Sequence, residues 1–218
     1  MIVDERITDY IESLDEELPE YLKELEKHAI ETETPIIRKD AESFLRALIE
    51  MKQPKEILEI GTAIGFSASL MAEYMPVDCH ITTIEKVEMR LKEARENLKK
   101  IKRAEDVTLI EEDALTALKK LREEGRQFDF VFLDAAKGQY HAFLQDILPM
   151  MPAGAVLLTD NVLQEGSLIE SKYVIERRDR TIHMRMREFL YEIKHDERLV
   201  TSIVCVGDGM ALSVKKRS

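Results

Sequence analysis

From residue 56 onward, short runs of apolar and largely β-branched residues alternate with longer stretches of helical periodicity. Strands that are apolar on both faces, with helices between them, are typical of a parallel sheet that is covered on both sides. The alternation therefore predicts an α/β fold. The expected strands are 56–61, 80–85, 107–113, 128–134 and 154–160, and the expected helices between them are 67–74, 88–102, 115–124 and 139–150.

Both ends of the chain depart from this alternation. The first 53 residues have apolar residues at helical spacing, interrupted at Pro35 and closed by Pro54. We expect a helical cap at 1–53, which packs against a core at 54–218 or serves as a dimer surface. The length of 218 residues fits one domain. The cap helices are expected at 6–18, 20–31 and 38–52, and an antiparallel hairpin is expected at 199–206 and 210–216, turned at Gly207-Asp208-Gly209.

Composition narrows the class of protein. No apolar run approaches the ~20 residues of a membrane span, and the acidic, amphipathic N-terminus differs from a signal peptide. The two cysteines, Cys79 and Cys205, lack the CxxC spacing and indicate free thiols in a reducing compartment. We therefore expect a cytoplasmic protein that has no membrane partner.

Charge is distributed unevenly along the chain. The net charge of −11 argues against a broadly basic nucleic-acid-binding protein. Residues 172–187, here called the basic segment, contain six Lys or Arg and two acidic residues, so this segment is positive on an otherwise acidic chain. Two interpretations stay open from charge alone. The basic segment contacts an anionic partner, or it is a solvated helix face with its own ion pairs.

The expected first strand runs into the sequence EIGTAIGFS, residues 59–67. In an open α/β sheet, ligands bind beyond the carboxyl ends of the strands. The loop has Gly61 and Gly65 but lacks the middle glycine of a dinucleotide fingerprint, and no Gly-Lys-Ser/Thr follows as in a P-loop. It therefore favours a ligand without a pyrophosphate, near Glu59 and Ser67. An ordinary strand-to-helix turn is the alternative for the two glycines alone.

Acidic residues also follow the second and third expected strands. Glu85 stands where a carboxylate can accept both hydroxyls of a ribose, and Asp113 with Ala114 can meet an adenine edge. A nucleoside cofactor without a diphosphate is S-adenosylmethionine. A surface acid is the alternative for Glu85 alone, but the ordered series of motifs favours the cofactor.

Oxygen-bearing side chains end the fourth and fifth expected strands. The stretch FVFLDAAKGQY places Asp134 after an apolar run, with Lys137 three residues later, and AVLLTDN ends in Asp160 and Asn161. Three oxygen ligands suit a hard divalent cation, and the histidines of the chain do not have the spacing of a zinc site. Mg²⁺ is the first candidate, and Mn²⁺ and Ca²⁺ are further candidates. A helix cap and a turn are the alternatives for these residues singly.

Together, EIGTAIGFS, Glu85, FVFLDAAKGQY, LLTDN and VGDGMALSVKK resemble the metal-dependent O-methyltransferases related to catechol and caffeoyl-CoA O-methyltransferases. The resemblance runs from about Thr34 to the C-terminus. It implies a Rossmann-like class I methyltransferase fold, with a seven-stranded, mostly parallel sheet, an antiparallel terminal strand and helices on both faces. It also implies a homodimer.

The same resemblance implies roles for individual residues. Asp134, Asp160 and Asn161 would hold the metal. Lys137 and Asp134 would be the catalytic residues, with Lys137 as the base or as the residue that orients the reacting oxygen. The residues expected to bind S-adenosylmethionine, by the resemblance or by their place after the strands, are Ile37, Glu59, Gly61, Ser67, Glu85, Asp113, Ala114 and Asp134.

A narrower resemblance is to the bacterial tRNA 5-hydroxyuridine methyltransferases, on the basis of RITDYIESL, KQPKEILEIGTAIGFSA, LDAAKGQY, TDNVL and the basic segment before VGDG. It implies methyl transfer to 5-hydroxyuridine at the wobble position of tRNA, which gives 5-methoxyuridine, with the anticodon stem-loop as partner. The expected RNA contacts are Lys172, Arg177, Arg178, Arg180 and Arg185.

The chain departs from the patterns of these families at several places. Ile37 stands where the tRNA-modifying branch tends to have methionine, and Glu176 and Asp179 interrupt the basic segment. The chain has no tryptophan, so the aromatic gatekeeping of the animal catechol enzymes has no direct counterpart. Two alternatives therefore stay open: a methyltransferase of small catechol-type molecules, and a nucleoside-binding or dimerisation module without catalysis.

Overall fold

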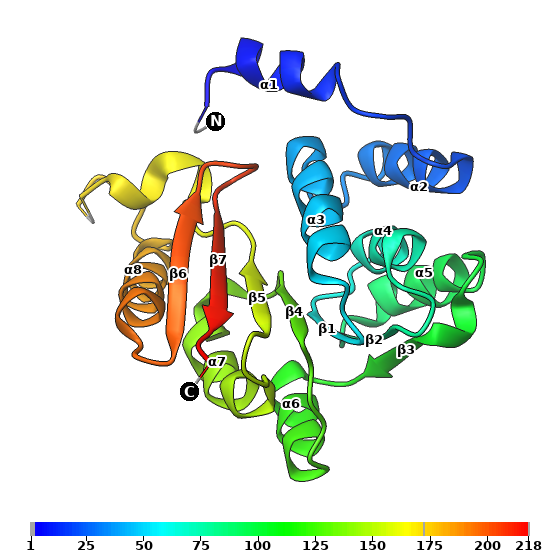
Figure 1. Cartoon of the computed structure of the whole chain (residues 1–218). Helices are drawn as coiled ribbons and strands as arrows, with labels where there is room; N and C mark the ends of the chain where they lie inside the picture. Colours follow the sequence, from blue (N-terminus) through cyan, green and yellow to red (C-terminus); the bar gives the residue numbers. More distant parts are fainter. Residues whose placement is uncertain (1–2, 172, 218) are drawn as a thin grey trace.

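Seven strands form one sheet in the computed structural model, which describes residues 3–171 and 173–217. Their order is β3-β2-β1-β4-β5-β7-β6 (Figure 1). Strands β1 to β5 run parallel, and β7 pairs antiparallel with both β5 and β6. This confirms the predicted class I methyltransferase fold. The strands are β1 (Glu56–Ile60), β2 (His80–Glu85), β3 (Val107–Glu111), β4 (Phe130–Leu133), β5 (Val156–Thr159), β6 (Leu199–Val204) and β7 (Met210–Lys215).

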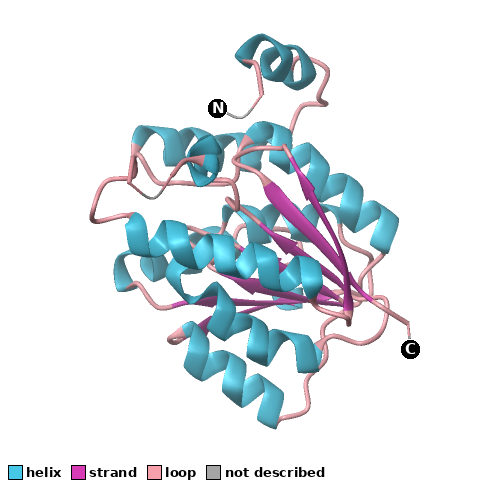
Figure 2. Ribbon diagram, turned by 90° about the vertical axis from the view of Figure 1, so that its left-hand side faces the viewer, coloured by secondary structure: helices cyan, strands magenta, loops and turns pink. Residues whose placement is uncertain are grey.

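Helices cover both faces of the sheet (Figure 2). One face carries α6, α7 and α8, and the other carries α2 to α5. The α-helices are α1 (Glu5–Glu12), α2 (Glu20–Glu31), α3 (Lys39–Lys52), α4 (Phe66–Tyr74), α5 (Glu88–Leu98), α6 (Ala114–Glu123), α7 (Tyr140–Met150) and α8 (Arg180–His195). Short 3₁₀ turns lie at η1 (Ala104–Asp106), η2 (Lys137–Gln139) and η3 (Gln164–Ile169).

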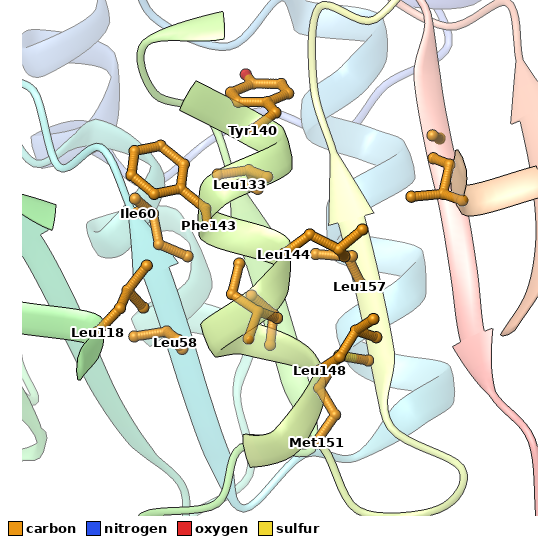
Figure 3. Packing of buried hydrophobic residues seen from close by; sticks show 14 of the residues in the cluster. Leu58, Ile60, Leu118, Leu133, Tyr140, Phe143, Leu144, Leu148, Met151 and Leu157 are labelled. Atoms are coloured by element: carbon orange, nitrogen blue, oxygen red, sulfur yellow. The ribbon is translucent and has the colours of Figure 1, made fainter. Parts of the chain in front are cut away.

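Strand β4 shows why the strands are apolar on both sides. Phe130 and Phe132 point into the core under α2 to α5, whereas Val131 and Leu133 point into the core under α6 to α8. Figure 3 shows Leu133 within the second of these cores. Each fully buried side chain of this size contributes roughly 1.5–3 kcal/mol relative to exposure. The two cores thus fix the register of the strands, and with it the positions of the loops that follow them.

The N-terminal helices differ in how they join this core. Helices α2 and α3 bury Leu22, Leu25, Leu45 and Ile49 in the same cluster as the strands. Helix α1 contributes no buried residue, and both ribbon views draw it apart from the sheet (Figures 1 and 2). No helix among the described residues is long and apolar enough to cross a membrane.

Several expected boundaries are corrected by the structure. The third strand ends at Glu111, because Asp113 accepts a hydrogen bond from Leu115 N at 3.0 Å and caps α6. The first helix ends at Glu12 rather than at residue 18, and the helix expected at 88–102 ends at Leu98. Among the α-helices of the described residues, α8 is the one that the sequence pattern does not single out, since its dense arginines mask the periodicity of its buried residues.

Candidate active site

A cavity of about 680 Å³ opens at the carboxyl ends of the parallel strands. Its walls include Gly61 after β1, Glu85 at the end of β2, Asp113 and Ala114 after β3, Asp134 and Lys137 after β4, and Asp160 and Asn161 after β5. Residues from both ends of the chain, Arg38 and Asp208, complete the lining. The topology therefore gathers most of the residues that the sequence singles out into one cleft.

The loop after β1 depends on a glycine. Gly61 has φ +106°, and a Cβ at this position would lie 1.9 Å from the carbonyl oxygen of Asp134. A glycine here lets the loop of β1 pass directly against the end of β4. Ala63, with φ +47°, is held by its N–H, which donates to Glu85 Oε2 at 3.0 Å. The floor of the cleft is thus fixed by backbone contacts between neighbouring strand ends.

Glu85 and Asp113 form the acidic side of this half of the cleft. Glu85 accepts hydrogen bonds from the backbone N–H groups of Lys86 at 2.8 Å and Val87 at 2.9 Å, in addition to that of Ala63. Lys86 Nζ lies 2.9 Å from Asp113 Oδ2 and lowers the pKa of that carboxyl group. A carboxylate has about four acceptor sites, so Glu85 retains capacity for a ligand hydroxyl.

Three expected cofactor residues lie outside the cavity lining. Ser67 and Thr83 each donate a hydrogen bond of 2.5 Å to the fully buried Glu59 carboxyl group. Burial raises the pKa of Glu59 to about 7. Glu59, Ser67 and Thr83 thus form a buried hydrogen-bonded cluster below the Gly61 loop. The third expected residue, Ile37, is buried next to Ile36, which does line the cavity.

Asp134 and Asp160 face each other at the other end of the cleft. Burial raises the pKa of both carboxyl groups, and that of Asp160 rises to about 7 because of burial and the neighbouring charge of Asp134. Asn161 Nδ2 lies 3.5 Å from Asp134 Oδ1, and Asn161 N donates to Asp160 Oδ1 at 2.6 Å.

This arrangement fits a hard divalent cation. No group of three His, Cys, Asp or Glu side chains within residues 3–171 and 173–217 is arranged to hold a metal ion. The set here is instead two carboxylates and one amide, all oxygen donors that Mg²⁺, Mn²⁺ and Ca²⁺ prefer. Two buried, mutually repelling carboxylates would be relieved by a cation between them.

Lys137 approaches the same acids from η2. Its charge lowers the pKa of Asp134 and, to a smaller degree, that of Asp160. It lines the cavity together with Gln139. An amine beside two carboxylates is placed to accept or orient a proton on a ligand oxygen.

The described residues of the basic segment, 173–187, lie outside the cavity lining. Arg178 pairs with Glu176 at 3.0 Å and Asp179 at 3.5 Å, so the basic segment has ion pairs of its own, although they lie in the turn before α8 and not on a helix face. Arg180 Nε donates to Ile175 O at 3.0 Å, and Arg185 Nη1 donates to Gly138 O at 3.0 Å, next to Lys137. Arg177 lies in the turn before α8, and Lys172 is outside the described residues.

Comparison with known proteins identifies the family. A family model described as O-methyltransferase matches residues 12–216. The chain belongs to this O-methyltransferase family. It is similar to a caffeoyl-CoA O-methyltransferase-like protein of Arabidopsis thaliana, with 30% identity over 200 residues that cover 88% of this chain and 85% of the relative. Catechol O-methyltransferase of Niastella koreensis is 31% identical over 128 residues, which cover 58% of each chain.

Solved structures of this O-methyltransferase family have the same fold. An O-methyltransferase from Bacillus cereus, whose structure is a complex with S-adenosylhomocysteine, superposes with a TM-score of 0.85 at 25% identity. The match covers 97% of this chain and 97% of that protein. A caffeoyl-CoA O-methyltransferase-like protein from Staphylococcus aureus gives a TM-score of 0.85 at 28% identity, covering 96% and 97%.

Several residues that line the cleft were not expected as site residues from the sequence, among them Arg38 and Asp208. Arg38 precedes α3, and Asp208 lies in the turn between β6 and β7. Their only sequence signal is weak: Asp208 lies between two glycines in the predicted hairpin turn, and Arg38 lies beside Ile37, an expected cofactor residue.

Proposed function

We propose that this O-methyltransferase uses S-adenosylmethionine and a divalent cation to methylate one of two adjacent oxygens on its acceptor, with a small catechol-type molecule as the first candidate. The observation that carries the proposal is the division of one cleft into two acidic halves. Glu85 and Asp113 lie in one half, here called the cofactor half. Asp134, Lys137, Asp160 and Asn161 lie in the other, here called the metal half.

The cofactor half suits a nucleoside with a short charged chain. Glu85 has acceptor capacity for a ribose hydroxyl, and Asp113 with Ala114 forms the wall that would meet the base. The loop at Gly61 supplies no phosphate cradle of the P-loop type. The Bacillus cereus relative that binds S-adenosylhomocysteine supports this assignment.

The metal half would hold the acceptor. Bound by Asp134, Asp160 and Asn161, Mg²⁺ (or Mn²⁺ or Ca²⁺) would supply positive charge that lowers the pKa of an acceptor hydroxyl. Lys137 would accept or steer the proton that leaves this hydroxyl. S-adenosylmethionine, held in the cofactor half, would supply the methyl group that this oxygen accepts, with the sulfonium sulfur as the leaving group. The chain contributes mainly position and charge stabilisation.

Two acceptors satisfy the requirement for adjacent oxygens. Catechol has two neighbouring hydroxyls, and the Niastella koreensis relative supports this class. The second candidate is 5-hydroxyuridine at the wobble position of tRNA, whose 5-oxygen lies beside the 4-carbonyl. One observation favours it: Arg185 links the basic segment to the carbonyl of Gly138, next to Lys137, so a bound anticodon loop would lie near the cleft.

One pair of assays separates the two acceptors. The purified protein, with S-adenosylmethionine and Mg²⁺, would be given a panel of catechols and, separately, tRNA from cells that lack 5-methoxyuridine. Mass spectrometry then reports methylated catechol or 5-methoxyuridine. Methylation of catechols alone supports the first candidate, and methylation of tRNA alone supports the second. Failure with every acceptor that has two adjacent oxygens contradicts the proposed function.

If 5-hydroxyuridine in tRNA is the acceptor, we expect the basic segment to contact RNA phosphates. If Arg177, Arg178 and Arg180 contact phosphates, their replacement by Gln should weaken tRNA binding, and binding by the unmodified protein should fall steeply with salt. An affinity that is indifferent to both changes excludes this contact. The acceptor assays above are unaffected by that result.

We also propose that the protein is a homodimer in which a second copy covers α1. Helix α1 exposes its apolar side chains to solvent: Ile7 is 52% exposed, Tyr10 65%, Ile11 44% and Leu14, just past the helix, 65%. A two-fold interface brings the same patch of both copies together and covers both at once. The many acids around this helix, among them Glu5, Asp9 and Glu12, argue against an anionic membrane surface as the partner.

Light scattering coupled to gel filtration tests the dimer. We expect the unmodified protein to have the mass of two chains and the double variant Ile7→Glu/Leu14→Glu to have the mass of one. Ile30→Glu is the control, because Ile30 is 69% exposed on α2, outside this patch. A monomeric unmodified protein, or a dimer that survives the double substitution, contradicts the proposal.

A further inference from the structure

Arg38 forms part of the cleft wall on the side of the metal half. Its Nη2 lies 2.9 Å from Asp208 Oδ1, and both residues line the cavity. The charge of Asp208 acts on Asp160, where it contributes to raising the pKa, so Asp208 lies close to the proposed metal ligands. Arg38 thus pairs with a residue, Asp208, that lies close to the acids that would hold the cation.

The position of Arg38 is fixed by the turn Gly207-Asp208-Gly209, here called the GDG turn. On one side, Gly207 N donates to Asp40 Oδ2 at 2.7 Å, which ties the turn to the start of α3. On the other side, Leu163 N donates to Asp208 O at 3.0 Å, and Val162 N donates to Gly209 O at 2.9 Å.

The GDG turn therefore joins the segment that carries Arg38 to the segment that follows Asn161. This junction is tight, because a Cβ on Gly209, which has φ +84°, would lie 2.4 Å from Leu163 Cγ. The place of Arg38 relative to the metal half is therefore set by packed backbone and not by the ion pair alone.

The charge balance of the metal half depends on what is bound. The described side chains there include three acids, Asp134, Asp160 and Asp208, and two cations, Lys137 and Arg38. When the proposed divalent cation is present, positive charge exceeds negative charge, and the sulfonium of the proposed cofactor adds to the excess. A loaded cleft of this kind attracts an acceptor that carries its own negative charge.

We infer that Arg38 is a specificity-determining residue that binds an anionic group on the acceptor, away from the oxygens that react. The inference rests on the proposed function and names the substrate class within it: acceptors with adjacent oxygens and a carboxylate or a phosphate.

Arginine suits this role because its planar fork matches both anions. The guanidinium side chain is 37% exposed and pairs with Asp208 at the rim, and such a pair contributes at most about 1 kcal/mol. An acceptor anion can therefore bind the guanidinium together with Asp208, and the pair with Asp208 orients the guanidinium.

The test compares matched charged and neutral ligands. Titration calorimetry with protein loaded with Mg²⁺ and S-adenosylhomocysteine would measure binding of catechol, of 3,4-dihydroxybenzoate, of 5-hydroxyuridine and of 5-hydroxyuridine 5′-monophosphate. We expect the unmodified protein to prefer the charged member of at least one pair. The pair in which the preference appears tells a carboxylate source from a phosphate source.

Substitution then assigns the preference to one residue. Arg38→Ala should weaken binding of the preferred anionic ligand by about 10-fold or more and leave its neutral counterpart unchanged, while Arg38→Lys should retain part of the preference. Arg46→Ala is the matched control, because Arg46 lies on α3, the helix that directly follows Arg38, is 38% exposed and pairs with Glu16 at 2.6 Å, but does not line the cavity.

The outcomes separate this inference from the function on which it rests. Lack of a preference in the unmodified protein, or a preference that survives Arg38→Ala, overturns the role of Arg38. Turnover of the same four ligands with S-adenosylmethionine is measured in parallel. An intact, Arg38-dependent preference without turnover of any acceptor overturns the proposed methyl transfer and leaves the anion contact supported. With turnover, Arg38→Ala should raise KM for the anionic acceptor and leave kcat nearly unchanged.

Discussion

The carboxyl groups in the cofactor half of the cleft have close hydrogen-bond or ion-pair partners, whereas those in the metal half are mainly affected by burial. In the cofactor half, Glu85 accepts three backbone hydrogen bonds, and Asp113 is paired with Lys86, which lowers its pKa. In the metal half, burial raises the pKa of Asp134 and Asp160. The protein itself supplies hydrogen-bond and ion-pair partners to Glu85 and Asp113. A bound positive charge would be needed to stabilise Asp134 and Asp160 in their charged forms. The same residue types therefore serve two tasks, and their surroundings distinguish them.

The largest effect is expected from the one lysine of the metal half that faces both acids. Lys137→Ala should reduce turnover by about 10²–10⁴, because a positioned proton acceptor is lost. Binding of S-adenosylhomocysteine, measured by calorimetry, should remain nearly unchanged. Lys86→Ala is the comparison in the cofactor half, and its turnover at saturating cofactor should stay close to that of the unmodified protein. Equal losses of turnover in the two variants would contradict the assigned role of Lys137.

Stability against pH distinguishes the metal half in a second way. Burial and the charge of Asp134 raise the pKa of Asp160 from its ordinary value of 3.8 to about 7 in the folded protein. Between these values the folded state binds more protons than the unfolded state, so its stability falls as pH rises and levels off above about pH 7. Mg²⁺ should recover stability at pH 8, where the acids are charged, and little at pH 5, where protons already occupy them. Thermal melts with and without Mg²⁺ at both pH values test this.

Two variants show whether the effect of Mg²⁺ on thermal stability comes from the metal half. Asp160→Asn should stabilise the metal-free protein at pH 8 by up to a few kcal/mol, because a buried charge is removed, and should abolish the response to Mg²⁺. Burial also raises the pKa of Glu59 to about 7 and that of Glu42 to about 8. Those groups add to the decline with pH in the same direction but lie outside the cleft, so Glu42→Gln should keep the Mg²⁺ response. A response to Mg²⁺ that persists in Asp160→Asn contradicts the metal site.

The sequence is most informative about the ends of the strands. Apolar runs that stop at Glu85, Asp134 and Asp160 locate the polar residues correctly, because in a parallel sheet all such ends face one edge. The sequence is least informative about contacts between distant segments. Arg38 and Asp208 meet only because the GDG turn packs against the start of α3, and no local pattern encodes that contact.

The same limit explains the residues that lie away from the cleft. Glu59 precedes the Gly61 loop by two positions, but strand alternation turns it onto the buried face covered by α2 to α5, where Ser67 and Thr83 bind it. Helix α8 was missed for another reason. Its buried face includes His183, Met186, Phe189 and Ile193, and the arginines between them conceal this spacing.

A smaller effect is expected in the cofactor half. Glu85→Gln keeps the size of the side chain but replaces one acceptor oxygen with an NH₂ group, which can only donate. We expect about a 10-fold loss of affinity for S-adenosylhomocysteine, since one hydrogen bond to a charged group is worth roughly 1.5–3 kcal/mol. Mg²⁺ should still stabilise this variant at pH 8, which separates the two halves. Glu88→Gln, an exposed acid on α5, is the control. Unchanged cofactor affinity in Glu85→Gln would argue against its role.

The smallest effect concerns Asp113, and it has the opposite dependence on pH from Asp160. Asp113 caps α6 through Leu115 N and pairs with Lys86, so its pKa is lowered in the folded state. Its contribution to stability is therefore present above its unfolded pKa and is lost as pH falls through the folded pKa. Asp113→Ala should cost about 1 kcal/mol at pH 7, the usual loss for a helix cap, and less near pH 3. Urea unfolding at both pH values measures this. A cost that grows toward low pH would show that Asp113 resembles the buried acids of the metal half, and the contrast between the two halves would then fail.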